Sequence, residues 1–443
     1  MNKGKSITLL SLIFVVMACL LAMTFVPFSV GTSNFNSVLG AIETDYDLSG
    51  GTAYELELAE DNTEPVENVN DVIDTLKFRL NALGYENFSV KAVRPAGEEF
   101  ADYTIRIEVK AATNAYGEPD LTSLDADVQT AAKYGELEFF GGSASNPSDK
   151  ILEGKKVISG VSDSSYKDEN GSLKYYVAIT FTDEAYKYIS DKMGEGSFYF
   201  KVTLGGETLS PFDGTSALST SSFGQTVMVT TGSEAAAKQM ALQISSGGLK
   251  YNYDTPVRIG AVNSPLGENA KMFAFIALGA LVVAAAVALI IAYKGFGLVS
   301  ALSMVLFAVI ELSMLIAVPG IKLCMGGVIG MAAAALLTVD GFVITARRIK
   351  EEFTGGKTVK AAMKAGFKRS LVPVINSAVI SAVVSVLLIL FTKGQIKGFA
   401  ITFGIGAVVS AICTLVFTRM FASLFMGAVK DKEAFFSLKR KEA

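Results

Sequence analysis

Two carboxylates stand inside long apolar runs of the sequence. Asp340 lies within residues 338–343, TVDGFV, and Glu311 lies within residues 308–312, AVIEL. A charged side chain at membrane depth is costly unless it faces a cavity, a partner or a proton path. Asp340 is therefore the first candidate for a proton-carrying group and Glu311 is the second, although each acid could instead hydrogen-bond a neighbouring helix.

The expected depths of the two acids differ. Glu311 lies about eight residues from the outer end of its predicted helix, and Asp340 about seven from the inner end of the next. At a rise of about 1.5 Å per residue, their depths differ by roughly 8–10 Å. Two buried carboxylates at staggered depths could pass protons through water.

Other kinds of chemistry lack the residues that they need. The chain has no histidine, and its three cysteines, Cys19, Cys324 and Cys413, all lie in apolar runs. Zinc sites and catalytic triads depend on such residues at suitable spacing, and the GxxxxGK[ST] phosphate loop is also missing from the sequence. We therefore expect no ATPase or other enzyme, no metal site and no cofactor, so proton chemistry must use carboxylates.

Six apolar runs are each near or above the ~20 residues that a spanning helix needs. The first covers Ile7 to Phe28; it is longer than the ~7–15 residues of a signal-peptide core, and residues 27–31, PFSVG, form no cleavage site. We expect an uncleaved anchor (1–28), a five-helix membrane domain (271–428) and a basic tail (429–443). The five later runs lie at roughly 272–293, 296–318, 321–346, 371–392 and 396–426.

Lys and Arg in the short loops predict the orientation of the chain in the membrane, because short loops rich in these residues are cytoplasmic. Lys3, Lys5, Lys294, the cluster 347–369 and the tail 430–441 fall on one side. Both termini are then expected in the cytoplasm, with the chain in the inner membrane and residues 29–270 outside. Residues 29–270 hold 36 Asp and Glu against 18 Lys and Arg, which argues against nucleic acid as a partner.

The periodicity of residues 41–141 predicts the order βαββαβ, which is typical of a ferredoxin-like module. We therefore predict an α+β exterior domain with a ferredoxin-like base at 29–141, to which 233–270 returns, and a second lobe at 142–232. The base strands are expected at 52–58, 88–93, 103–109 and 136–140, and its helices at 69–83 and 121–133. The second lobe is expected to have strands near 175–181 and 198–204 and a helix near 183–193, and another helix is expected near 233–246.

Several motifs together resemble the SecD/SecF family of the resistance-nodulation-division superfamily. They are DLSGGT at 47–52, FRLNALG at 78–84, residues 339–352, AGFKR at 365–369 and IKGFA at 396–400. Taken alone, Gly50 and Gly51 are typical of a turn or bulge that opens a strand. The resemblance covers essentially the whole chain, and it places Asp340 on the family's presumed proton carrier and Asp47, Gly50 and Gly51 on its exterior base motif.

The resemblance also implies a function. It implies a membrane subunit that pulls unfolded preprotein outward with the proton motive force, beside SecF and the SecYEG channel. The sequence departs from the family pattern at two places. The family's Asp-Ala-Asn is here Asp340-Gly341-Phe342, and residues 376–381 read NSAVIS. Fewer polar groups therefore line the expected proton path, and Glu311 could compensate for their loss. Two alternatives stay open: a half-size exporter of lipids or small molecules, and an anchored binding or sensing protein without transport.

Overall fold

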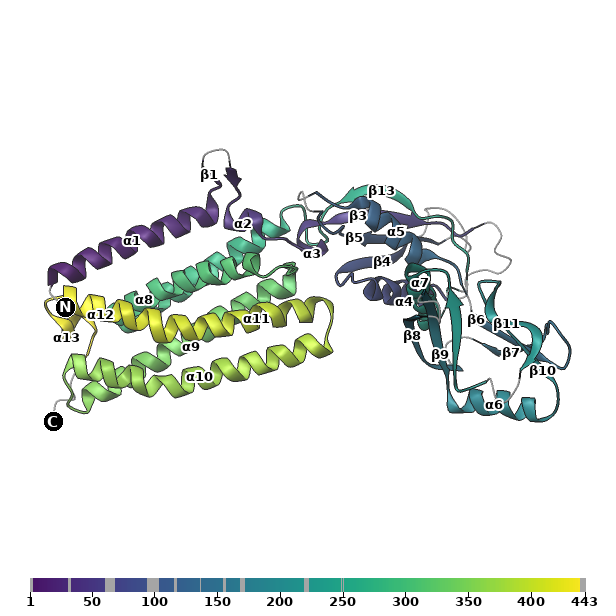
Figure 1. Ribbon diagram of the computed structural model, residues 1–443. Helices are drawn as coiled ribbons and strands as arrows, with labels where there is room; N and C mark the ends of the chain where they lie inside the picture. Colours follow the sequence, from purple (N-terminus) through teal and green to yellow (C-terminus); the bar gives the residue numbers. More distant parts are fainter. Residues whose placement is uncertain are drawn as a thin grey trace. The chain divides into compact units, whose positions relative to one another are not determined.

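The computed structural model describes residues 3–30, 33–59, 68–93, 103–114, 118–135, 137–153, 157–167, 172–218, 223–247, 249 and 251–438. The chain forms two compact units (Figure 1). The helical unit comprises Met1–Gly50 and Asn263–Ala443, and the mixed unit comprises Gly51–Val262. Residues 29–50, which the sequence analysis assigned to the exterior base, thus belong to the helical unit. The basic residues Lys439, Arg440 and Lys441 and the strand residue Glu136 lie outside the described residues.

Five helices of the described residues are long and apolar enough to cross a membrane. The last of these spans contains two helices and the π-helical turn η2 (Cys413–Phe417) between them. The first span is followed by the short paired strands β1 (Phe28–Val30) and β2 (Ser33–Phe35) and by α2 (Val38–Ala41) and α3 (Tyr46–Ser49). The long helices are α1 (Lys3–Phe25), α8 (Ala270–Ala317), α9 (Met325–Thr354), α10 (Val359–Phe391) and α11 (Gly394–Ile412), which continues through η2 into α12 (Thr418–Ala428).

Helix α8 accounts for the difference between these five helices and the six spans expected from the sequence. Its 48 residues contain a non-helical residue, Lys294, with φ 48° and ψ −117°. A Cβ atom added to Gly297 would collide with the carbonyl oxygen of Leu289, whereas residues eight apart in one straight helix lie about 12 Å apart along its axis. The chain therefore turns back at Lys294, and α8 consists of two arms.

Small residues let α9 and α11 pack closely. Added Cβ atoms at Gly326 and Gly330 would collide with backbone of the first turns of α11. The Thr402 hydroxyl of α11 donates to the carbonyl oxygen of Gly327 at 2.8 Å. Such close approach is how helices associate in lipid, where apolar burial gives little drive. The contact holds α9 at the centre of the unit, against α8, α10 and α11.

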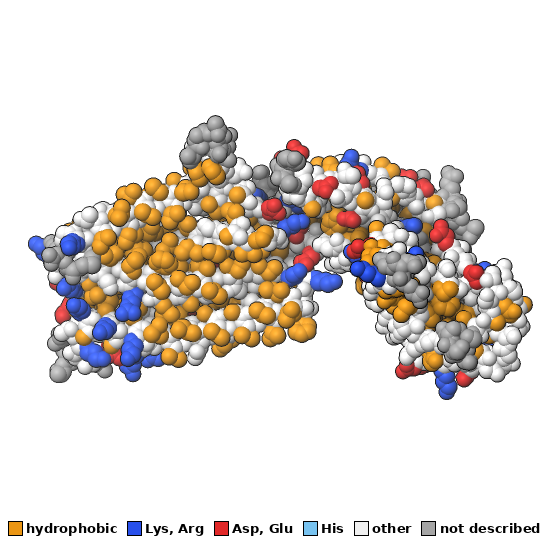
Figure 2. Space-filling view, in the orientation of Figure 1, with side chains coloured by type: hydrophobic (Ala, Val, Ile, Leu, Met, Phe, Trp, Pro, Cys, Tyr) orange, Lys and Arg blue, Asp and Glu red, His pale blue; other side chains and the backbone are white. Residues whose placement is uncertain are grey.

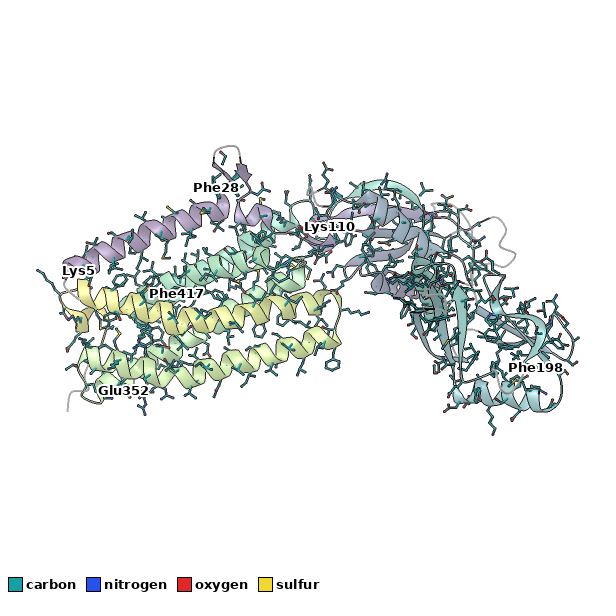
Figure 3. The ribbon with its side chains drawn as sticks, viewed as in Figure 1. Lys5, Phe28, Lys110, Phe198, Glu352 and Phe417 are labelled. Atoms are coloured by element: carbon teal, nitrogen blue, oxygen red, sulfur yellow. The ribbon has the colours of Figure 1, made fainter. Side chains whose placement is uncertain are left out.

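The surface of the helical unit is divided by chemistry. Figure 2 shows hydrophobic side chains over the visible face of its helices and Lys and Arg gathered at one end. Lys5 and Glu352 lie at this end, while Phe28 follows the other end of α1 (Figure 3). The short helix α13 (Lys432–Phe435) packs against α8 at the end where α1 begins. An apolar band closed by a basic end is the pattern of a membrane-embedded unit.

The mixed unit contains an antiparallel sheet of order β13-β3-β5-β4. Two helices, α4 and α5, cover it with buried leucines and valines such as Leu76, Leu80 and Val128. The expected strand at 136–140 forms, but it belongs to another sheet, and β13 takes the fourth place through the pair Gly51↔Val262. The elements are β3 (Gly51–Leu56), α4 (Val69–Ala82), β4 (Phe88–Val93), β5 (Thr104–Val109), α5 (Leu121–Ala132) and β13 (Val257–Val262).

The second lobe has two sheets, of order β11-β10-β6-β7 and β12-β9-β8. Their inner faces share one core, built around Phe139, Phe181 and Phe200. Its elements are β6 (Leu137–Gly142), β7 (Lys150–Glu153), β8 (Ile158–Lys167), β9 (Leu173–Phe181), α6 (Asp183–Gly194), β10 (Phe198–Leu204), β11 (Glu207–Leu218), β12 (Thr226–Thr231) and α7 (Glu234–Ser246).

Arg79 joins the two lobes from inside. This residue of α4 is fully buried; its Nε donates to the Ser246 hydroxyl at the end of α7 at 2.9 Å, and its Nη1 donates to the carbonyl oxygens of Ala131 and Lys133 at 2.9 and 2.6 Å. Burial lowers the pKa of its guanidinium to about 10. The side chain is therefore still charged at neutral pH, and it holds α4, α5 and α7 together by charge-assisted hydrogen bonds.

Candidate functional site

Asp340 lies on the exposed face of α9. The sequence analysis expected it to be buried; within this chain it is exposed, as are Ile329 and Leu336 on the same face. The next residues turn inward: Phe342 is fully buried, and an added Cβ atom at Gly341 would lie 2.9 Å from the Thr414 hydroxyl of η2. A carboxylate thus projects from a helix whose other side is tightly packed.

Glu311 lies in the interior of the helical unit. Its side chain is 2 % exposed, and its Oε1 has no hydrogen-bond partner in the structure. The carboxyl fits against α11 only because residue 406 is glycine, since a Cβ atom there would collide with Oε1 and with Ala334. Glu311 is therefore a buried acid with an unfilled hydrogen-bonding position.

The structure does not bring the two acids together on one face. Glu311 lies at the level of Ala334, and Asp340 follows six residues later on α9. Six helical residues correspond to about 9 Å along the axis and about 240° around it. The expected difference in depth agrees with this spacing, but one carboxylate points into the unit and the other away from it.

Asp47 caps the N-terminal end of α9, the helix that carries Asp340. Its Oδ2 accepts hydrogen bonds from the Met325 amide at 2.5 Å and from the Gln395 side chain at 2.7 Å. The Gln395 Oε1 in turn accepts from the Gly326 amide at 2.6 Å, and the Cys324 sulfur accepts from the Gly327 amide. The first amides of a helix lack intrahelical partners and carry partial positive charge, so this carboxylate stabilises α9 where it begins.

The segment around Asp47 is tied to other helices as well. The carbonyl oxygen of Asp47 accepts from the Ser264 hydroxyl at 2.5 Å, before α8. The Lys271 ammonium of α8 donates to the carbonyl oxygen of Ile42 at 3.2 Å. The residues just before the mixed unit are thus bonded to the N-terminal ends of α8, α9 and α11.

Glycine is required at both positions of the DLSGG motif. Gly50 has φ 73°, in the left-handed region, and ends α3. Gly51 begins β3, and a Cβ atom there would collide with the backbone of Val109 on β5. The turn expected from the sequence is therefore present, with an additional close approach of two strands.

Gln395 and Glu352 were not singled out by the sequence analysis. Gln395 lies in the first turn of α11. Its only mark in the sequence is that it is a polar residue directly after Gly394, which is a weak signal of a functional role. Glu352 lies a half-turn from the C-terminal end of α9 and is 8 % exposed at its side chain. It accepts from Arg369 of α10 at 2.6 Å and also from Lys357. Polar groups therefore fasten α9 at both ends. Among the described residues, no group of His, Cys, Asp and Glu could hold a metal ion.

The fold and the site define an integral membrane protein in which a mixed unit is inserted between the first and second long helices. Residues 250–427 match the family described as "Protein export membrane protein SecD/SecF, C-terminal". Over these residues the chain is similar to the SecD/SecF family.

Individual relatives show the same similarity. The chain is 23% identical to "Protein translocase subunit SecD" of Acidaminococcus fermentans over 350 residues, which are 77% of this chain and 76% of that protein. It is 30% identical to the protein of the same name from Salmonella choleraesuis over 147 residues, 32% of this chain and 23% of the relative. A solved structure, "Crystal structure of SecDF in Super-membrane-facing form", shares the fold with a TM-score of 0.66 at 20% identity, covering 97% of this chain and 58% of that one.

Proposed function

We propose that the chain is a SecD-like accessory subunit of the Sec protein-export machinery. It aids the late translocation and release of unfolded preproteins, and it uses the proton motive force through Asp340. The observation that carries this proposal is the position of Asp340, a carboxylate on the exposed face of a helix that is otherwise apolar and packed. The names of the relatives indicate protein export as the process. A charged side chain at membrane depth usually marks function, which makes Asp340 the candidate for coupling export to the proton motive force.

The same exposed carboxylate favours a partner within the membrane. A charge facing lipid at the centre of the bilayer costs about 2.5–3.5 kcal/mol on insertion scales. Covering by another helical subunit would remove Asp340 from lipid and leave it beside a polar path. SecF is the partner that we propose for this face of α9, with the SecYEG channel and the unfolded preprotein as further partners.

We also propose six membrane crossings with both termini in the cytoplasm of the cell. Helix α8 would be about 72 Å long if it were straight, more than twice the ~30 Å hydrocarbon core. Its two arms on either side of Lys294 each have the length of one crossing. The basic end of the helical unit then faces the cytoplasm, in the inner membrane, and the mixed unit lies outside as an α+β domain with a ferredoxin-like base.

The decisive experiment is the release of a reporter preprotein from cells whose only copy carries Asp340→Asn. We expect release to slow by about tenfold or more, because losing a positioned proton-transfer group typically costs that much. Leu336→Asn is the matched control, since Leu336 is 55% exposed on the same face of α9. Membrane abundance is measured for both variants. Unchanged release in Asp340→Asn cells, with the deletion strain defective, would exclude proton coupling through Asp340.

A half-size exporter of lipids or small molecules remains the alternative. That function predicts an apolar tunnel through the exterior domain. The mixed unit instead has a cavity of about 530 Å³ whose lining includes Gln129, Lys133, Gln243 and Asp254. The lining also includes Leu204, Leu209 and Met240, so it is mixed and not the apolar tunnel that this alternative predicts.

A further inference from the structure

The first turns of α10 have a covered face and a charged face. The covered face packs on α9, since a Cβ atom added to Gly366 would collide with the backbone of Ile349. Three exposed lysines, one helical turn apart, follow a different face: Lys360, Lys364 and Lys368. Figure 2 shows Lys and Arg side chains at the end of the helical unit where α10 begins, next to its hydrophobic surface. We call these three residues the lysine row.

The carboxylates nearest in the sequence are already paired with other cations. Glu352 of α9 bonds Lys357 and Arg369. Glu351 pairs with Arg348 on its own helix. Among the residues that the structure describes, no member of the lysine row makes an ion pair, and none of the 33 residues of α10 is an Asp or Glu. The lysine row is therefore an excess of positive charge.

The start of α10 adds to this charge. Its first turn contains no acidic residue, and the side chain of its N-cap residue, Thr358, makes no capping hydrogen bond. The first amides of a helix carry partial positive charge, so that an anion stabilises this end and a nearby lysine does not. The lysine row thus stands where the helix itself already favours an anion.

An exposed apolar stripe continues the lysine row along α10. Its residues are between 38% and 64% exposed. At about 100° per residue, they fall within the same third of the helix surface as the lysine row. From Lys368 to the last of them the rise is about 16 Å, close to half of the ~30 Å hydrocarbon core. The stripe consists of Leu371, Val372, Ile375 and Val379.

We propose that the lysine row and the apolar stripe together bind an anionic phospholipid. Its phosphate lies on Lys364 and Lys368, and an acyl chain follows the stripe across one leaflet. Basic residues beside a membrane crossing attract anionic lipid heads. The bound head also relieves the repulsion between like charges that lie one helical turn apart.

A phospholipid fits this surface better than a free phosphate does. A phosphate ion would use only the charges and would leave the stripe without a ligand. A phospholipid has both parts, in the order in which α10 presents them: an anionic head at the helix start and a chain about as long as the stripe. The inference goes beyond the proposed function, because it depends only on the embedding of the helical unit in a membrane.

Lipid retention is measured by native mass spectrometry on the full-length protein in a neutral detergent. The protein is titrated separately with dioleoylphosphatidylglycerol, which is anionic, and with dioleoylphosphatidylcholine, which has the same chains and no net charge. We expect a preference of about tenfold for the anionic lipid. Sodium phosphate should displace this lipid no better than sodium chloride of equal ionic strength, because both salts only screen the charges.

Paired substitutions locate the site. Lys364→Gln with Lys368→Gln should lower the preference from about tenfold to about twofold, because two charges that attract the phosphate are lost. Lys364→Arg with Lys368→Arg keeps both charges and should retain the preference. The matched control is Lys430→Gln with Lys432→Gln, which removes the same charge from two exposed lysines after α12 and should also retain it. Thermal unfolding checks that each variant is folded.

Four results would overturn this site. Equal affinity for the two lipids is the result expected if the lysines only set the topology of the chain. Wild-type preference in the folded Lys364→Gln and Lys368→Gln double variant would show that the lipid binds elsewhere. An equal loss in the control pair would assign the effect to net charge, and stronger displacement by phosphate than by chloride would assign the lysine row to a free anion. The export role is tested separately, by preprotein release in the deletion strain.

Discussion

At the scale of single residues, Asp47 both caps α9 and links it to α11 through Gln395. One carboxylate oxygen accepts from the Met325 amide and from Gln395, while the other oxygen is buried without a partner. Because α9 also carries Asp340, a change at the N-terminal end of α9 reaches the helix on which the proposed proton coupling depends. We regard Asp47 as a positioning residue for α9.

Asp47→Ala should loosen the first turn of α9. Loss of a helix cap costs about 0.5–2 kcal/mol, so hydrogen exchange of the amides in residues 325–328 should accelerate by up to about thirtyfold. Asp47→Asn should have a smaller effect, because its amide oxygen can still accept one of the two bonds. Exchange is measured by mass spectrometry on the full-length protein.

Glu43→Ala provides the control for this measurement. It removes an exposed carboxylate four residues earlier and keeps the carbonyl oxygen that accepts from the Leu323 amide. If exchange in residues 325–328 were equally fast in Asp47→Ala and in Glu43→Ala, the capping role of Asp47 would be wrong.

The site was only partly predictable because its bonds are long-range. The hydrogen bond between Gln395 and Asp47 spans 348 residues, so no local pattern marks it. The exposure of Asp340 was missed for a related reason: hydropathy shows that a helix is apolar, but the packing of α9 on α11 decides which face is covered. Glu311 was correctly expected to be buried, since both its helix and the neighbouring ones are rich in apolar residues.

At the scale of elements, glycines determine how closely α9 approaches α11. An added Cβ atom at Gly330 would collide with the Thr402 hydroxyl and the carbonyl oxygen of Phe399. Gly279 on α8 has no atom within 4 Å of the same added position. The two residues have the same helical propensity, and only the first is needed for packing.

Gly330→Ala and Gly279→Ala should therefore have opposite effects on stability. Alanine stabilises an open helical position by about 0.8–1 kcal/mol relative to glycine, so Gly279→Ala should raise the thermal midpoint of the protein in detergent. Gly330→Ala should lower it, because overpacking costs about 1–3 kcal/mol and exceeds that gain. If both variants raised the thermal midpoint, the α9–α11 contact would accommodate the added methyl group, and the prediction for Gly330→Ala would be wrong.

Strand order was harder to predict than the strands themselves. Alternation in residues 52–58 and 103–109 predicted β3 and β5. In the structure the side chains of β5 alternate between buried and half-buried, whereas Thr52, Ala53 and Tyr54 of β3 are all buried. The fourth strand of that sheet comes from residues 257–262, more than a hundred residues after β6. Adjacent position in the sequence favoured β6 for this place, but pairing of β13 with β3 leaves β6 free to pair with β10.

At the scale of the whole molecule, the turn at Lys294 decides the topology. The six crossings that we propose would place Lys294 in the cytoplasm and Pro319, in the turn before α9, outside. Both residues are exposed in the structure. A single uninterrupted α8 centred in the bilayer would place Lys294 within it.

Lys294→Cys and Pro319→Cys test this topology with a membrane-impermeant maleimide. We expect Pro319→Cys to react in intact cells, and Lys294→Cys to react only in inverted vesicles. The unmodified chain gives the background from Cys19, Cys324 and Cys413. Reaction of both variants from the same side would contradict six crossings.

The pairing of Gly51 with Val262 makes the mixed unit separable by protein engineering. These residues are the first and last of the unit and cross-strand partners, so its two ends lie about 5 Å apart. A two-residue Asn-Gly turn could join Val262 directly to Gly51, with new ends opened in a surface loop. The result would be a circular permutant of residues 51–262 without any long apolar helix. The same short turn, placed between Gly50 and Asn263, would close the helical unit without its insert.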